Sequence, residues 1–102
     1  MDAERLIYRT TLIDWEATNY AECILSDQRL IIRWHDAGFD QYSLRTIEAV
    51  WLEDMPRSLR KRFRGQTDPA TVRIELASGR KIWLYSASGQ LAAQIQRALI
   101  PF

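Results

Sequence analysis

The sequence predicts a mainly β fold of the α+β class: a seven-stranded antiparallel barrel or sandwich capped by one C-terminal helix. Short segments rich in β-branched and aromatic residues recur along the chain and are separated by turn-forming residues. After Ser88 the apolar residues change from the spacing of a strand to the spacing of a helix. Because 102 residues is the size of one domain, we expect a single domain over 1–102.

Seven segments have the composition and flanking turns of strands. They are Arg5 to Ile13, Ala21 to Leu25, Arg29 to His35, Phe39 to Ser43, Ile47 to Glu53, Thr71 to Leu76 and Lys81 to Tyr85. The turns between them contain Asp27, Gly38 or Gly79, residue types that tolerate the backbone angles of tight turns. The spacing of these segments is typical of an all-β sandwich or barrel.

Alternation along the strands predicts which side chains share a face, because successive strand residues point to opposite sides of a sheet. The predicted sets are Val72, Ile74 and Leu76; Leu30, Ile32 and Trp34; and Ile47, Ala49 and Trp51. Three tryptophans, Trp34, Trp51 and Trp83, lie in predicted strands. We therefore expect at least two of these three to pack in the core.

The last segment has the pattern of an amphipathic helix. Its apolar residues are Leu91, Ile95, Ala98 and Leu99, at positions i, i+4, i+7 and i+8. Ser86 or Ser88 can cap its first amide groups, and Pro101 is expected to end it. A helix with one apolar stripe must lie against an apolar surface, and the open end of the sheet is the expected partner.

The charges are nearly balanced, with 14 Lys and Arg against 13 Asp and Glu and a net charge of +1. Such a balance produces no overall field that would draw the protein to DNA or a membrane. No apolar run approaches the roughly 20 residues of a transmembrane helix, and the N-terminal residues lack the pattern of a secretory signal. We expect a cytoplasmic protein, peripheral to the inner membrane face if it binds lipid.

The sequence offers little for catalysis or for a cofactor. The single histidine, His35, ends a predicted strand with no Ser or Cys nearby that would act as its nucleophile. One Cys and one His cannot assemble the ligand set that zinc prefers, and the glycines are too isolated for a phosphate loop. We expect no enzyme, no catalytic or metal-binding residue and no cofactor, with Cys23 acting as a small buried apolar group.

Three segments resemble the bacterial pleckstrin-homology (PH) and GRAM-like branches of the PH-like superfold. They are Cys23 to Ile32, with a Ser-Asp turn followed by Arg-Leu; Tyr42 to Val50; and Ile74 to Gly79, which ends in a Ser-Gly turn. The resemblance implies seven strands and one capping helix over nearly the whole chain. It also implies a binding or scaffolding module for lipid headgroups, peptides or copies of itself.

The first loop departs from the pattern of that family. PH domains that bind phosphoinositides typically carry basic residues between their first two strands, but Asp14 to Tyr20 contains two acids and no base. No headgroup-binding residue can therefore be carried over from the resemblance.

A basic segment between the two interior prolines is the strongest functional signal. Its five bases are Arg57, Arg60, Lys61, Arg62 and Arg64. If 58–64 forms a helical turn, the interleaved Leu59 and Phe63 share one face. The segment suits an anionic lipid surface, where each base adds about 1 kcal/mol, and it also suits nucleic-acid phosphates. The alternative is that Leu59 and Phe63 dock the segment on the core while the bases stay solvated.

The first loop contributes a second candidate, because Trp15 lies in it near Tyr20. An exposed Trp15 would mark a protein interface or a membrane-inserting tip, and packing under the loop is the alternative. Our leading hypothesis is attachment to anionic membrane through the five bases and Trp15. Its rival is a protein-interaction or self-assembling scaffold domain, with homo-oligomers formed through strand edges. Nucleic-acid binding ranks third, because the sequence identifies no aromatic stacking platform.

Overall fold

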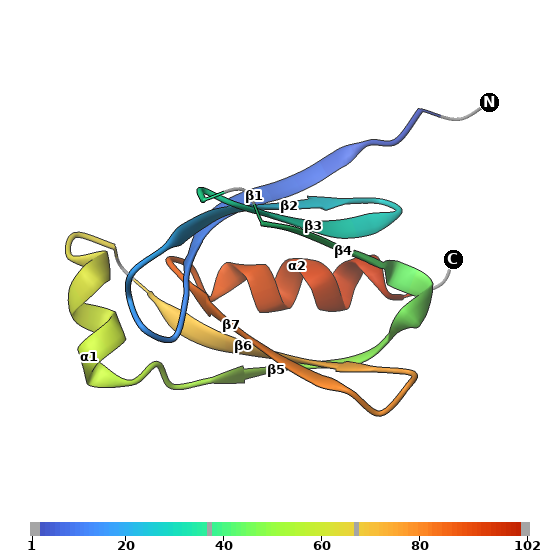
Figure 1. Ribbon diagram of the computed structural model, residues 1–102. Coiled ribbons are helices and arrows are strands. Elements are labelled where there is room, and N and C mark those ends of the chain that lie inside the picture. The colour runs from blue at the N-terminus through green and yellow to red at the C-terminus, as the bar shows by residue number, and fades with distance from the viewer. Residues whose placement is uncertain (1–2, 37, 67, 101–102) are drawn as a thin grey trace.

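The computed structural model describes residues 3–36, 38–66 and 68–100 and confirms seven strands and a C-terminal helix. The strands are β1 (Leu6–Ile13), β2 (Tyr20–Ser26), β3 (Arg29–Trp34), β4 (Phe39–Ser43), β5 (Ile47–Glu53), β6 (Ala70–Leu76) and β7 (Lys81–Ser86) (Figure 1). The helical elements are η1 (Leu44–Thr46), α1 (Arg57–Arg60), η2 (Lys61–Phe63) and α2 (Gln90–Ala98). Each strand boundary lies within one residue of its predicted position, because turn residues mark the strand ends locally.

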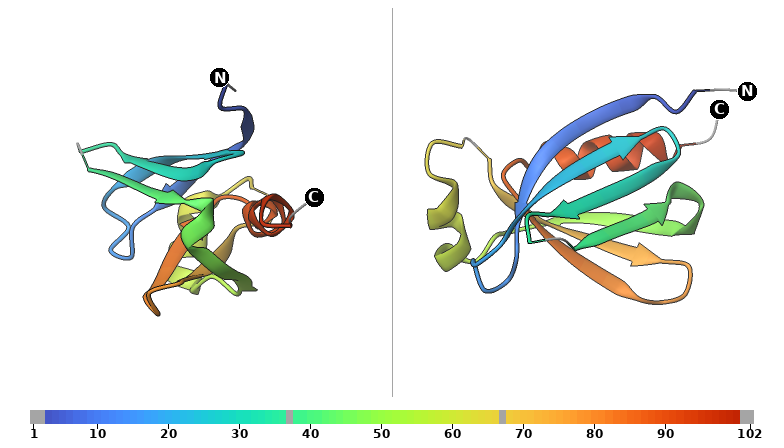
Figure 2. Two further views of the ribbon diagram at one scale, coloured as in Figure 1. Left: turned by 90° about the vertical axis from the view of Figure 1, so that its right-hand side faces the viewer. Right: turned by 45° about the horizontal axis from the view of Figure 1, so that its top comes forward.

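The seven strands form one antiparallel sheet in the order β4-β3-β2-β1-β7-β6-β5. Only two residue pairs, Leu12 with Ser86 and Ile13 with Tyr85, join β1 to β7. This short junction lets the sheet fold into two halves that face each other. Figure 2 shows α2 closing one side of the space between them, and Figure 1 looks in from the opposite, open side. The fold is thus the predicted sandwich capped by a helix.

The core lies between α2 and the inner faces of the two halves. Leu91 and Ile95 of α2 are fully buried there, as the helical spacing predicted. Gly89 is the N-cap residue of α2, and the Gln90 N–H, the first amide of the helix, donates to Ser88 Oγ at 3.1 Å, whereas Ser86 Oγ binds the Ser88 main chain. The predicted end of the helix at Pro101 lies outside the described residues.

Two strands bury the side chains that alternation predicted. Val72, Ile74 and Leu76 are buried, and so are Leu30 and Ile32, with Trp34 packed against the core at the end of β3. Cys23 is also buried in this core, as expected for a small apolar group. Burial raises the pKa of its thiol to about 12, so Cys23 stays neutral and unreactive in the folded protein.

The prediction for β5 was wrong, because a β-bulge interrupts the strand. Ile47 pairs with Leu76, but the register shifts before Ala49, and Val50 then pairs with Ile74. The extra residue moves every later side chain to the other face. Ile47 and Val50 are therefore buried, and Trp51 lies on the outer face with 38% of its surface exposed.

The expectation that at least two strand tryptophans pack in the core was also wrong, because only Trp34 does. Trp83 lies on the outer face beside the inward Leu84 and is 47% exposed. Trp51 and Trp83 both pair in register with Arg73 of β6, which lies between them. The Arg73 guanidinium carbon lies 4.4 Å from the centre of the Trp51 ring, a cation–π contact that stabilises this outer row.

Helix α2 also covers one outer edge of the sheet. The side-chain amide of Gln96 donates to the main-chain oxygen of Val50 at 2.8 Å, so a helix side chain occupies a hydrogen-bonding position on the edge strand β5. The other outer edge, β4, carries the exposed Phe39. The turn predicted at 36–38 includes residue 37, which lies outside the described residues. None of the helices among the described residues is long and apolar enough to cross a membrane.

Candidate functional site

The basic segment forms two short helical turns at one end of the molecule. Helix α1 begins after Pro56, whose main-chain oxygen accepts from the amides of Leu59 and Arg60, and η2 continues directly from it. Proline suits this position, because its fixed φ is helical and its missing N–H would be unpaired there in any case. The helical turn that the sequence considered for 58–64 is therefore present, divided between α1 and η2.

Two apolar side chains attach this segment to the sheet. Leu59 and Phe63 are buried in a second, smaller cluster, separate from the main core, which is the docked arrangement that the sequence left open as the alternative to a ligand-binding segment. The other buried members of this cluster are Ile13, Met55 and Ala87. Leu59 and Phe63 therefore dock the segment and are not available for insertion into a membrane.

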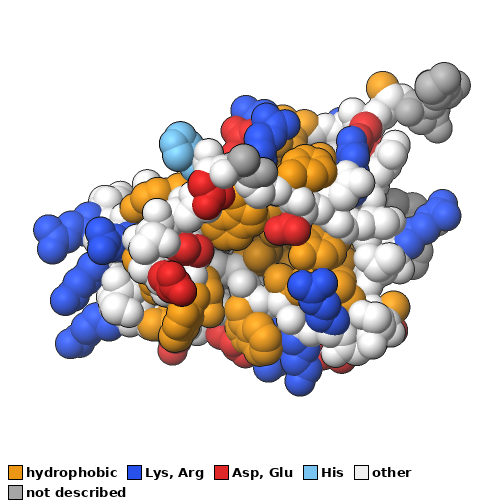
Figure 3. Space-filling model, in the orientation of Figure 1, with side chains coloured by type: hydrophobic (Ala, Val, Ile, Leu, Met, Phe, Trp, Pro, Cys, Tyr) orange, Lys and Arg blue, Asp and Glu red, His pale blue; other side chains and the backbone are white. Residues whose placement is uncertain are grey.

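The five bases of the segment all remain in solvent. Arg57, Arg60, Lys61, Arg62 and Arg64 are exposed, and none of them forms an ion pair within the described parts of the chain. The nearby Glu53 instead pairs with Arg73, with 3.3 Å between its carboxylate and Nη1. Figure 3 shows Lys and Arg side chains projecting from the end of the molecule where α1 lies. The local positive charge is thus free to meet an external anion.

The β1–β2 loop places Trp15 near this basic end. Trp15 is 64% exposed, and its ring centre lies 5.5 Å from that of Tyr85 in a tilted contact. Ala17 of the same loop and Tyr85 both pack against the cluster that holds Leu59 and Phe63. Of the two alternatives left open by the sequence, Trp15 therefore adopts the exposed one, on a support that it shares with α1.

A carboxylate inside the loop fixes its shape. Asp14 accepts hydrogen bonds from the amides of Thr18 and Asn19, at 2.8 and 3.1 Å, and from the Thr18 hydroxyl at 2.9 Å. Burial by itself raises the pKa of Asp14, but the hydrogen bonds from Asn19 and Thr18 outweigh it and hold the pKa below its ordinary value of 3.8. Asp14 is therefore ionised at neutral pH, and its carboxylate stabilises the conformation of the loop through these hydrogen bonds.

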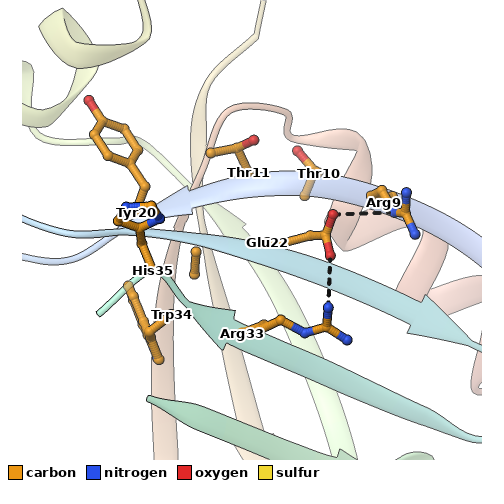
Figure 4. A pocket seen from close by; sticks show the side chains of 9 residues that line it. Arg9, Thr10, Thr11, Tyr20, Glu22, Arg33, Trp34 and His35 are labelled. Carbon is orange, nitrogen blue, oxygen red and sulfur yellow. Dashed lines mark ion pairs between the residues drawn. The ribbon is translucent and has the colours of Figure 1, made fainter. Parts of the chain in front are cut away.

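The outer face of β1, β2 and β3 contrasts with the basic end, because its charges are paired. Glu22 lies between Arg9 and Arg33, at 3.7 and 4.0 Å (Figure 4). His35 is exposed at the end of β3, as expected, and its amide donates to the Tyr20 main-chain oxygen. The Tyr20 ring points away from the paired charges (Figure 4). Glu22 therefore offsets one of the two positive charges of this face and lies near both.

Sequence reasoning missed the residues that support the basic end. Tyr85 contacts Trp15 from a strand far along the chain, and Met55 and Ala87 complete the cluster beneath α1. Alternation along the strand Lys81 to Tyr85 could have shown that Tyr85 shares a face with Trp83, but not which loop Tyr85 meets. Among the described residues, no three His, Cys, Asp or Glu side chains lie close enough to hold a metal ion.

No protein-family model matches the chain, and no curated protein or solved structure gives a significant match.

Proposed function

We propose that this protein is a non-catalytic binding module that attaches to anionic membrane surfaces through the five bases of 57–64 and Trp15. One observation carries the proposal: five exposed bases without ion pairs in the described chain project from a segment that two buried side chains hold in place. The order of the elements and the PH-like resemblance of the sequence both support a binding module that works without a cofactor. A cytoplasmic location, peripheral to the inner membrane face, goes with this function.

The energetics of such attachment are electrostatic. Near an anionic leaflet each Lys or Arg contributes about 1 kcal/mol, so five bases give useful affinity without a shaped headgroup pocket. An exposed tryptophan beside them can enter the headgroup region, where its amphipathic ring is favoured. Because the attraction is between solvated charges, physiological salt should weaken the binding. The expected ligand is therefore the negative surface and not one lipid species.

Co-sedimentation with vesicles tests the proposal. Phosphatidylcholine vesicles, with and without phosphatidylserine, would be compared at low and at physiological salt. The test variant replaces Arg60, Lys61 and Arg62 by Ser, and the matched control replaces Arg5, Arg45 and Arg97, three exposed bases outside the segment. Both variants lose the same net charge.

We expect the test variant to bind phosphatidylserine vesicles about 100-fold more weakly, since it loses three contributions of about 1 kcal/mol each, and the control to bind almost normally. Equal losses in both variants would show that net charge alone acts, and no binding by the unmodified protein would refute the proposal. A parallel titration with single-stranded oligonucleotides would identify nucleic acid as the anionic partner if it bound more tightly than the vesicles.

A protein-interaction or self-assembling role is the second candidate. The observation that favours it is the outer edge strand β4 with its exposed Phe39. Sedimentation velocity over a range of concentrations would detect homo-oligomers, and their formation should be nearly insensitive to moderate salt. That insensitivity separates this role from attachment to a charged surface.

A further inference from the structure

Half of β7 has an unpaired edge inside the molecule. β7 pairs with β6 along its length, but it meets β1 only at Tyr85 and Ser86, because β1 ends at Ile13 and the chain turns into the β1–β2 loop. The Ala87 amide donates to the Thr11 oxygen on the β1 side. Main-chain groups alternate between the two sides of a strand, so those of Trp83 and Lys81 point toward this side as well. There β1 offers them no partner.

A groove of about 330 Å³ runs along this edge. Its lining includes the apolar Leu12, Ile82 and Leu84, flanked by Trp15 and Trp34. On the side of the sandwich opposite α2, the two halves of the sheet stand apart (Figure 2). Figure 3 views this open side and shows hydrophobic side chains gathered along its middle. An exposed apolar groove beside an unpaired strand edge is a template for an added strand.

Positive charge predominates in the lining of the groove. Arg80 and Lys81, at one end of its lining, are exposed and form no ion pair with any described residue. The one acid in the lining, Asp14, accepts three hydrogen bonds within its own loop. The lining therefore has two positive charges against one negative charge, and both bases lie where β7 begins.

Arg80 and Lys81 are consecutive in the chain, and both contribute to the lining at this end of the groove. A carboxylate brought into this end would therefore lie near both bases.

We propose that the groove binds an extended segment of a partner protein, which adds to the free edge of β7 as a strand. Its main chain would pair with Lys81 and Trp83, its alternate apolar side chains would lie against Ile82 and Trp34, and an acidic residue would meet Arg80 and Lys81. A peptide fits better than an acyl chain, because only a peptide supplies donors and acceptors at strand spacing. This function goes beyond membrane attachment and does not depend on it.

The experiment selects peptides from a displayed library of random linear sequences on the unmodified protein. The probes are then the selected peptides, titrated by fluorescence anisotropy. The test variant is R80E/K81E, and the matched control is R5E/R45E, which reverses two exposed bases elsewhere. Hydrogen exchange followed by NMR reports on the Lys81 and Trp83 amides, and the spectrum of each variant shows whether it is folded.

We expect enrichment of peptides that combine Asp or Glu with alternating apolar residues. They should bind R80E/K81E about tenfold more weakly or worse, bind the control normally, and slow the exchange of the Lys81 and Trp83 amides. Peptides that bind without protecting these amides, or a selection without enrichment, would overturn the proposal. Protection that appears in the protein alone as its concentration rises would also overturn it, since the occupant would then be a second copy. The R60S/K61S/R62S variant should keep peptide binding, which separates this site from the membrane surface.

Discussion

Helix α2 and the segment formed by α1 and η2 differ in how many of their side chains contact the rest of the fold. Helix α2 buries Leu91, Ala92 and Ile95 in the main core, and Gln96 on its polar side bonds the edge of β5. The segment formed by α1 and η2 buries only Leu59 and Phe63 and exposes five bases that form no ion pair in the described chain. Packing and sheet hydrogen bonding explain much of α2, but they leave the bases of α1 unexplained. The clustering of these five bases is the feature on which the proposed function rests.

The largest expected contrast compares Leu91→Ala in α2 with Leu59→Ala in α1. Both substitutions remove a buried leucine, which costs about 2–5 kcal/mol of unfolding free energy. We expect the upper part of this range for Leu91, at the centre of the main core, and the lower part for Leu59, because the small cluster beneath α1 can collapse more easily. Urea unfolding followed by circular dichroism measures both values. A larger loss at Leu59 would reverse the comparison.

The polar side of α2 provides a smaller test. Gln96→Ala removes the hydrogen bond to Val50 and should lower the unfolding free energy by about 0.5–1.5 kcal/mol. Gln94→Ala is the matched control, because Gln94 lies on the same helix and has no side-chain hydrogen bond among the described residues. If both variants unfold at the same urea concentration, the Gln96 bond contributes nothing to stability.

Acidic pH should affect the β1–β2 loop, which lies near α1, and should leave α2 unchanged. The pKa of Asp14 is lower in the folded protein than in the unfolded chain, so its contribution to stability is complete above its ordinary value of 3.8. The contribution is lost as the pH falls toward the folded pKa. We expect the Thr18 and Asn19 amide signals to shift over this acidic range while those of α2 stay constant. Asp14→Asn should abolish the transition, and its persistence would assign it to another carboxyl.

The bases of α1 should have the smallest effect on stability. Replacing any one of them by Ser should change the unfolding free energy by less than about 0.5 kcal/mol, because each is exposed and has no ion-pair partner in the described chain. Thermal unfolding of the five single variants would measure this. A loss well above that value at any position would mean that the base supports the fold, so its exposure there would not indicate a ligand-binding role.

Local patterns explain why so much of the fold could be predicted. Turn residues mark the strand ends, alternation identified the inner faces of β3 and β6, and helical spacing identified the buried face of α2. The i, i+4 spacing of Leu59 and Phe63 likewise identified the face that docks the basic segment, although the sequence left docking open as one of two alternatives. Each of these signals lies within a few residues of the structure that it predicts.

The errors and omissions depend on contacts between distant parts of the chain. The bulge before Ala49 belongs to the pairing of β5 with β6, and nothing inside β5 reveals it. It turned Trp51 outward, where Arg73 of β6 covers its ring. The contact of Trp15 with Tyr85 and the free edge of β7 depend in the same way on the junction between β1 and β7. Residue spacing alone carries no information about such pairings.

The Gln96 bond to Val50 has a consequence for how copies of this protein could assemble. Growth of a filament by strand addition requires an open edge at both ends of the sheet, so that each new molecule presents a fresh end to the next. Here α2 lies along β5 and occupies that edge, which leaves β4 as the only outer edge free of helix. Two copies joined through β4 would therefore leave no second outer edge free of helix in either copy. The same hydrogen bond that fastens α2 thus blocks one position on the edge along which strand addition would continue.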